Sequence, residues 1–318
     1  MVGFVQSGDI METRKELLGI LLVLAIGVCF ALANTLAGLA YTGGTDALSV
    51  STARFFLPAL ILLIILIAKG RKLILPRRDG LIAIALGLVT VVYTWALLSA
   101  IEILPVPLVI LVFYLFPVFT TFIVAAMGWE PLSRINLIAA LVAFAGLALA
   151  LGVSSQSINP VGVIFAGIGA LGLATVSAVS HRVIRSGDPR QATFYMAATA
   201  AITFVVITLS NGEFRLPTTE PGWWGFIGTN LFYAVGMIGF FAAISLIGPA
   251  KTTLYSYVEP LVAVGAAFVL LDQVLEPLQI LGGVVVVGAL VAAARVNLTT
   301  SKPETTPGVP ENDDPASP

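Results

Sequence analysis

The sequence predicts an all-α integral membrane protein with ten transmembrane helices, arranged as two inverted five-helix repeats. Composition gives the first indication, since 58% of the 318 residues are hydrophobic and 10% are charged. A typical soluble domain has about 45–50% apolar and about 25% charged residues. The mean hydropathy is +1.02. So few charges cannot cover the surface of a soluble protein of this length, and we therefore expect a multi-pass membrane protein.

Ten apolar segments, separated by charges and by Pro or Gly clusters, are long enough to cross a bilayer. A membrane helix needs about 20 mostly apolar residues. The third and fourth segments nearly join, but Pro105 and Pro107 separate them, because a helix interior does not tolerate two prolines. The expected spans are 17–40, 46–68, 79–101, 106–127, 133–152, 160–181, 190–210, 222–246, 249–271 and 277–296.

The positions of Lys and Arg support ten spans and predict their orientation. Fourteen of the 16 Lys and Arg residues share one side of the membrane, and the other two are Arg54 and Arg215. Because basic residues concentrate in cytoplasmic loops, we expect both termini in the cytoplasm and the protein in the cell (plasma or inner) membrane. Residues 1–16 are then a cytoplasmic segment, and the polar residues 297–318 a disordered cytoplasmic tail.

A weak internal repeat relates the two halves of the chain. A shift of 143 residues places Tyr114-Leu-Phe-Pro117 on Tyr257-Val-Glu-Pro260, within the fourth and ninth predicted spans. Five spans per half is an odd number, so the second half must enter the membrane in the opposite orientation. Inverted repeats of this kind are common in secondary transporters, whose binding site lies near the midplane. We expect the repeats to cover 17–152 and 160–296.

Further motifs accompany the ten spans and the inverted halves: Arg54-Phe55, Pro117, Trp129-Glu130-Pro131-Leu132, Glu259-Pro260 and Asp272-Gln273. With these features, the sequence resembles the EamA-type, ten-helix members of the drug/metabolite transporter superfamily. The resemblance implies a secondary transporter and not an enzyme. Such a transporter would export a small metabolite, amino acid or amphipathic compound by alternating access. Two alternatives remain open: an exchanger of sugar phosphates or nucleotide sugars, and a non-transporting membrane scaffold or sensor.

Glu259 is the one acidic residue, of 17 in the chain, that lies near the middle of a predicted span. An ionisable group at bilayer depth costs about 2.5–3.5 kcal/mol and is a functional candidate by default. Pro260 frees the carbonyl four residues back, which predicts a local kink with access to water. Thr252 and Tyr255 share a helical face with Glu259. The carboxyl either binds a cation or a proton during transport, or is a protonated group hydrogen-bonded to a neighbouring helix.

Arg54 is the matching basic residue inside a span. It could bind a substrate carboxylate or pair with Glu259, or it could extend to the headgroups in a structural role. Further polar side chains could line an aqueous cavity with these two, although each could equally join neighbouring helices by hydrogen bonds. The remaining candidates are Tyr255, Asn34, Tyr93, Trp95, Asn230 and Tyr233.

The expected partners are a small-molecule substrate, membrane lipids and protons. Nucleic-acid binding is disfavoured, because the sequence has no basic face with interleaved aromatic residues. Cys29 and His181 are the single cysteine and histidine, so neither a disulfide nor a His-cluster metal site is predicted. No cofactor is expected, since nucleotide-binding and hydrolase motifs are missing. The oligomeric state is open, and a monomer is compatible with the sequence.

Overall fold

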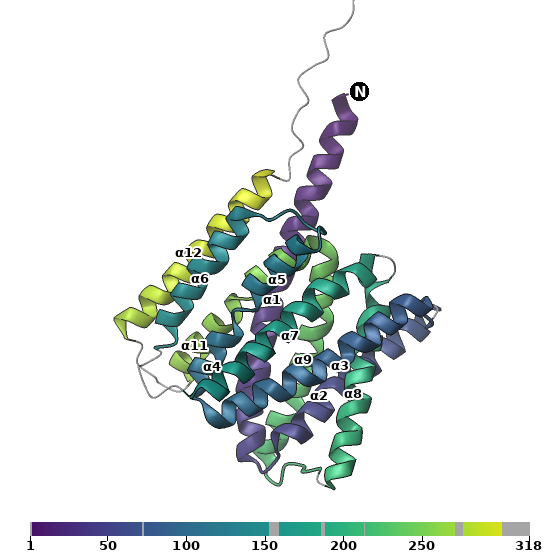
Figure 1. Ribbon diagram of the computed structural model, residues 1–318, viewed down its shortest axis with the longest axis vertical. Coiled ribbons are helices and arrows are strands. Elements are labelled where there is room, and N and C mark those ends of the chain that lie inside the picture. The colour runs from purple at the N-terminus through teal and green to yellow at the C-terminus, as the bar shows by residue number, and fades with distance from the viewer. Residues whose placement is uncertain are drawn as a thin grey trace, which may run out of the picture.

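The computed structural model describes residues 2–71, 73–152, 159–185, 188–212, 214–270 and 276–300. Within these residues, all regular secondary structure is helical (Figure 1). The helices are α1 (Val2–Thr42), α2 (Ala47–Ala68), α3 (Arg77–Ile103), α4 (Val106–Phe113), α5 (Phe116–Ala126), α6 (Arg134–Ala150), α7 (Pro160–Arg185), α8 (Pro189–Asn211), α9 (Glu220–Ile247), α10 (Pro249–Tyr255), α11 (Val258–Leu270) and α12 (Pro277–Thr300).

The helices account for the ten predicted spans. Eight segments are long and apolar enough to cross a membrane, with α4 and α5 together forming one of them. Helix α6 has 17 residues, which is at the lower limit of about 17–25 for a membrane helix. The pair α10 and α11 forms the remaining span, which is the ninth in chain order. The prediction of an all-α, ten-span membrane protein is confirmed.

The fourth and ninth spans are broken helices rather than the continuous ones predicted. Helix α4 ends at Phe113 and α10 ends at Tyr255. Pro117 and Pro260 explain both positions, because a proline cannot donate to the carbonyl four residues earlier, which is that of Phe113 in one repeat and Ser256 in the other. The kink expected at Pro260 is therefore a full break, and the first repeat has its counterpart.

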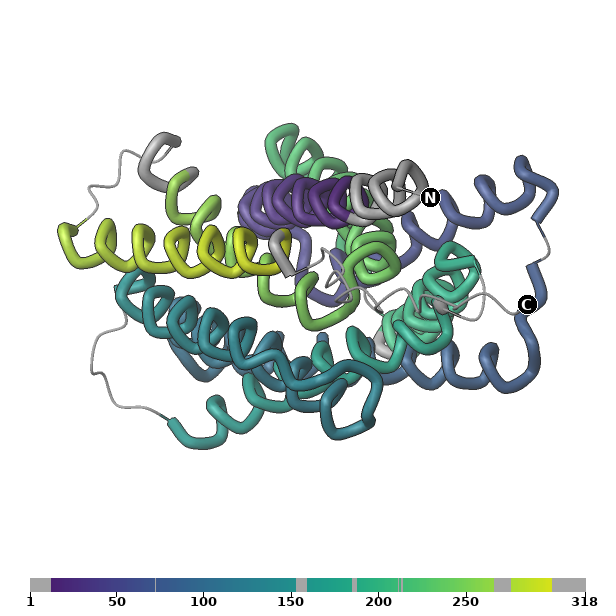
Figure 2. Tube along the Cα trace, turned by 90° about the horizontal axis from the view of Figure 1, so that it is seen from above, coloured from purple at the N-terminus to yellow at the C-terminus, as the bar shows by residue number. Residues whose placement is uncertain are grey.

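The two repeats pack as an inverted pair. Helix α1 packs on α9 and α3 packs on α7, while α2 packs on α8 and α6 on α12. Exchanging each helix with its counterpart in the other repeat reproduces these pairs, as a pseudo-twofold axis requires. Figures 1 and 2 show α6 and α12 side by side. They are antiparallel and close: a Cβ on Gly146 would lie 2.9 Å from the carbonyl oxygen of Gly282.

At the N-terminal end, α1 begins at Val2 and so includes most of the predicted cytoplasmic segment. One expectation about the other end is corrected: the predicted tail begins too early, since α12 continues to Thr300. The reason is Asn297, which is buried and donates from Nδ2 to Asn136 Oδ1 at 3.0 Å and to the Tyr255 hydroxyl at 3.2 Å. The remaining tail, residues 301–318, lies outside the described residues, as do Asp272 and Gln273.

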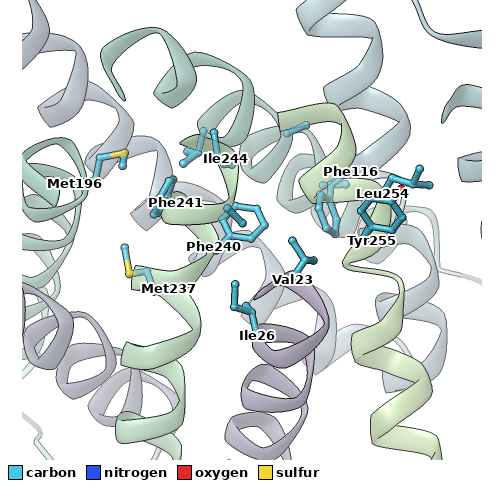
Figure 3. Packing of buried hydrophobic residues seen from close by; sticks show 14 of the residues in the cluster. Val23, Ile26, Phe116, Met196, Met237, Phe240, Phe241, Ile244, Leu254 and Tyr255 are labelled. Carbon is cyan, nitrogen blue, oxygen red and sulfur yellow. The ribbon is translucent and has the colours of Figure 1, made fainter. Parts of the chain in front are cut away.

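One end of the helical bundle carries most of the Lys and Arg residues, and we call it the basic end. The other is called the opposite end. At the basic end, Lys251 Nζ lies 2.5 Å from Glu16 Oε1 and joins the start of α10 to α1. At the opposite end, the loop 43–46 binds the segment 214–219, with Thr218 N donating to Gly43 O at 2.8 Å. Apolar side chains fill the centre, and Figure 3 shows Val23 and Ile26 of α1 facing Phe240 of α9.

Candidate functional site

A cavity of about 160 Å³ lies between helices of both repeats. A single water needs roughly 10–15 Å³, so the cavity has room for a hydrated interior. Its wall is mainly aromatic, with a small number of polar groups. The lining residues are Phe30, Asn34, Arg54, Phe55, Thr90, Tyr93, Thr94, Leu97, Phe113, Phe116, Leu173, Tyr233, Met237, Phe240, Phe241, Ser256 and Glu259.

Glu259 lies in the first turn of α11, directly after the second helix break. The unpaired N–H groups at the start of a helix favour a negative charge at this position. Asn34 Nδ2 of α1 donates to Glu259 Oε1 at 3.0 Å, and the Tyr114 hydroxyl is hydrogen-bonded to the same side chain. The carboxyl, which belongs to the second repeat, is thus held by two residues of the first repeat and faces the cavity.

Gly27 allows α1 to approach the start of α11 closely. A Cβ on Gly27 would overlap the Val258 side chain and lie 3.4 Å from the Glu259 backbone nitrogen. The absence of a side chain at this residue lets Asn34, two turns further along α1, reach the carboxyl. Gly27 is therefore part of the reason that Glu259 has its partner.

Arg54 projects from α2 into the same cavity. Its Nη2 donates to Thr229 Oγ1 at 3.1 Å, and its Cζ lies 4.6 Å from the centre of the Tyr233 ring, a cation–π contact. Its Nε is buried and has no hydrogen-bond partner. A guanidinium held over an aromatic ring with an unused donor suits an anionic group of a ligand. Within the described chain, Arg54 and Glu259 make no ion pair with each other.

Five of the eight predicted site residues lie together in the cavity. Tyr93 of α3 and Tyr233 of α9 are hydrogen-bonded through their side chains, and the Tyr233 ring lies under Arg54. With Asn34 and Glu259, these residues give the cavity one basic and one acidic group.

Two of the remaining predicted residues do not line the cavity, because of helix phase and local bonding. Trp95 is 56% exposed and contacts Phe165 edge-on at 5.5 Å. Tyr93 and Thr94 face the cavity, and one further residue of helix turns Trp95 away from it. Asn230 is buried outside the cavity and donates to the Phe226 carbonyl of its own helix at 2.6 Å, as short polar side chains commonly do.

Tyr255 does not line the cavity either, and the face that it was expected to share with Thr252 and Glu259 is interrupted. The break at 256–257 ends the helical register, so the spacing across it no longer places these residues on one side. Tyr255 is fully buried and its hydroxyl accepts from Asn297. It joins α10 to α12 rather than lining the cavity.

The structure adds residues that sequence reasoning missed. Tyr114 reaches Glu259 from the other repeat, and the alignment of Tyr114 with Tyr257 was an available signal for it. Thr229, which binds Arg54, carried no signal. The phenylalanines of the cavity wall, among them Phe116 and Phe240, carried no signal either. An apolar residue in a cavity wall cannot be distinguished by sequence from one in a packed core.

The lining residues extend toward both ends of the bundle. Asn34 of α1 and Arg54 of α2 are in the halves of their helices toward the opposite end, whereas Phe240 and Phe241 are in the half of α9 that leads to the basic end. Toward the basic end the centre is closed by packed side chains, including those of Val23, Ile244 and Leu254 (Figure 3).

Broken helices at matching places in two inverted repeats, with a polar cavity beside them, define a class of inverted-repeat membrane transporters. Comparison with known proteins gives the family. The model of the EamA-like transporter family matches residues 17–152 and 160–295. The chain belongs to this family, whose members are transporters and not enzymes.

Solved structures share the fold. Twenty-nine chains match. One of them, titled only as the crystal structure of a protein, is 18% identical, covers 89% of this chain and 97% of its own, and has a TM-score of 0.72. An identity this low supports the fold alone. No functionally curated protein matches the chain.

Proposed function

We propose that this protein is a secondary transporter that exports a small metabolite, amino acid or amphipathic compound by alternating access, with proton coupling through Glu259. One observation carries the proposal: a cavity lined by both repeats contains the side chains of both Arg54 and Glu259. The repeats, 17–152 and 160–296, would rock about this cavity. Discontinuous helices beside a midplane site are typical of such transporters.

The two charges favour a substrate with two poles. An anionic group would bind the unused Arg54 donor, and a cationic group would bind the Glu259 carboxylate. The aromatic wall would accept an apolar body between the poles. A small zwitterion such as an amino acid meets all three requirements. A doubly anionic sugar phosphate does not, since it would require two or three cations and Arg54 is the one that lines the cavity in the described chain.

Proton coupling would arise from competition at Glu259. The ionised carboxylate binds a cationic group, whereas the protonated carboxyl does not attract one. A proton taken up at Glu259 on one side of the membrane would therefore release the substrate there, and loss of the proton on the other side would restore the site. One substrate would move against one proton.

We further propose that the basic end is cytoplasmic, with both termini there, and that the protein lies in the plasma or inner membrane. The distribution of Lys and Arg supports this orientation.

The test is flux through the purified protein in liposomes. A panel of labelled compounds, including zwitterionic amino acids, their amides, which keep the ammonium group but lack the carboxylate, and simple sugar phosphates, would be compared at two internal pH values. We expect zwitterions to be transported most efficiently and their flux to depend on internal pH. Arg54→Lys keeps the charge but loses the planar fork and ring contact, so affinity for zwitterions should fall about tenfold, or about 1.4 kcal/mol. Flux of sugar phosphates alone would contradict the proposal.

A further inference from the structure

Tyr114 and Tyr257 occupy the same position in the two repeats and meet each other in the protein core. They are 143 residues apart, which is the shift that aligns the repeats. The Tyr257 hydroxyl donates to the backbone carbonyl of Tyr114 at 2.7 Å, and the two rings lie 5.5 Å apart. The bond therefore joins the two helix breaks directly.

The contact is asymmetric, although the positions are equivalent. In an exact twofold arrangement, the Tyr114 hydroxyl would donate to the Tyr257 carbonyl. It is bonded to Glu259 instead. Tyr114 therefore contacts the second repeat twice, through its backbone carbonyl and through its hydroxyl. The side-chain contact depends on the state of Glu259, whereas the backbone contact depends only on Tyr257.

Burial makes the hydrogen bond between the Tyr257 hydroxyl and the Tyr114 carbonyl costly to break. Tyr257 is 0% exposed and Tyr114 is 4% exposed. A buried hydroxyl that loses its acceptor costs about 1–3 kcal/mol, so Tyr257 and the Tyr114 carbonyl are expected to move together. Phe116 packs on Tyr114 at a ring distance of 5.4 Å, which extends the rigid group into α5.

We infer that Tyr114 and Tyr257 are positioning residues that pass the occupancy of Glu259 to both broken helices, so that the two repeats change conformation together. The inference rests on the proposed function, because it assigns a consequence to cation or proton binding at Glu259. Each tyrosine has a separate part: Tyr114 detects the state of the carboxyl, and Tyr257 ties the two breaks to one another.

The surroundings of Glu259 make Tyr114 the contact between this carboxyl and the other helix break. The side chains that bind it are Asn34 of α1 and Tyr114 beside α4. The charged or titratable groups facing it from other packed elements are Arg54 of α2, Tyr93 of α3 and Tyr233 of α9. Of these, Tyr114 alone belongs to a break. A change at Glu259 therefore reaches the first repeat's broken helix through the Tyr114 hydroxyl.

The test needs no substrate. Spin labels would be placed at Met127 and Ser245, both exposed near the basic end, after Cys29→Ala removes the native thiol. Distances between labels would be measured in liposomes at low and high pH. Infrared difference spectra would follow protonation of Glu259, assigned by its loss in Glu259→Gln. Tyr257→Phe and Tyr114→Phe are the test variants, and Tyr255→Phe, a buried hydroxyl on the adjacent helix, is the matched control.

We expect the distance distribution of the unsubstituted protein to change with pH and that of Glu259→Gln to be fixed. Tyr257→Phe should at least halve the pH-dependent change while the infrared signal of Glu259 still titrates. Tyr114→Phe should shift the titration itself, and Tyr255→Phe should behave as the parent. A full distance change in Tyr257→Phe would overturn the inference alone. A parent protein whose distances do not respond to pH would overturn the proton coupling and the inference with it.

Discussion

The two helix breaks, 113–117 in the first repeat and 256–260 in the second, interrupt the backbone in the same way but differ in the side chain that each presents to the cavity. Each has a tyrosine near the break and a proline three residues after it. The residue before each proline lines the cavity, and it is Phe116 in one repeat and Glu259 in the other. The first break adds an aromatic wall, and the second adds a charge.

This difference separates the scaffold from the function. Proline and tyrosine recur because both repeats need a broken helix and a buried contact at the axis. The carboxyl does not recur, so the fold does not require it. A group that costs free energy to bury and that the scaffold can omit is best explained by what it binds.

The largest effect is expected when a carboxyl is introduced into the first repeat at the position equivalent to Glu259. Phe116→Glu places a second carboxyl beside the first, at a cost of about 2.5–3.5 kcal/mol for insertion, with repulsion from Glu259 in addition. We expect a large loss of folded protein, measured by thermal unfolding in detergent. Phe116→Leu, which keeps the wall apolar, is the control. A Phe116→Glu variant as stable as the parent would show that the first break tolerates charge as well as the second.

The starts of the two broken helices differ as well. Lys251 of α10 pairs with buried Glu16, whereas the 143-residue shift places Leu108 at the equivalent position of α4. Breaking a buried pair costs about 3–5 kcal/mol. The loss of stability in Lys251→Met should be near the lower limit of this range, because the Lys251 side chain is still 26% exposed.

Thermal unfolding would measure this loss, and Glu16→Gln added to Lys251→Met should recover part of it, because no buried charge is then left without its partner. Equal stability of Lys251→Met and the parent would mean that the pair does not hold α1 against α10.

A smaller effect is expected where α1 approaches the second break. Gly27→Ala would overlap Val258 and push α11 away from Asn34, at a cost of about 1–3 kcal/mol. Gly38→Ala in the same helix meets nothing within 4 Å and should be neutral or slightly stabilising, because Ala favours helix over Gly. Equal melting temperatures for the two variants would show that the close approach at Gly27 is not required.

Much of the fold could be predicted from the sequence, because membrane spans depend on length, hydropathy and the positions of charges. The number of spans and the pairing of Tyr114 with Tyr257 follow from such one-dimensional signals. The positions of Asn230 and Trp95 do not, since a central polar or aromatic residue can point to any side of its helix. Tyr255 shows a further limit. Pro260 predicted a kink in the helix, but the helix is interrupted completely, and an interruption changes which side of the helix the residues before Pro260 occupy.

The account depends most directly on Glu259 as the proton-binding group of the cavity. The decisive measurement is the internal pH of liposomes, followed with a trapped dye, while the panel compound of highest flux moves down its own gradient. The parent and Glu102→Gln, a variant of an exposed carboxyl at the end of α3, should both move protons in the direction opposite to that compound. Glu259→Gln also loses the carboxylate that binds the cationic group, so it should carry less compound, and the compound that it carries should move with no change in internal pH. Proton movement in Glu259→Gln equal to that of the parent would contradict the assignment.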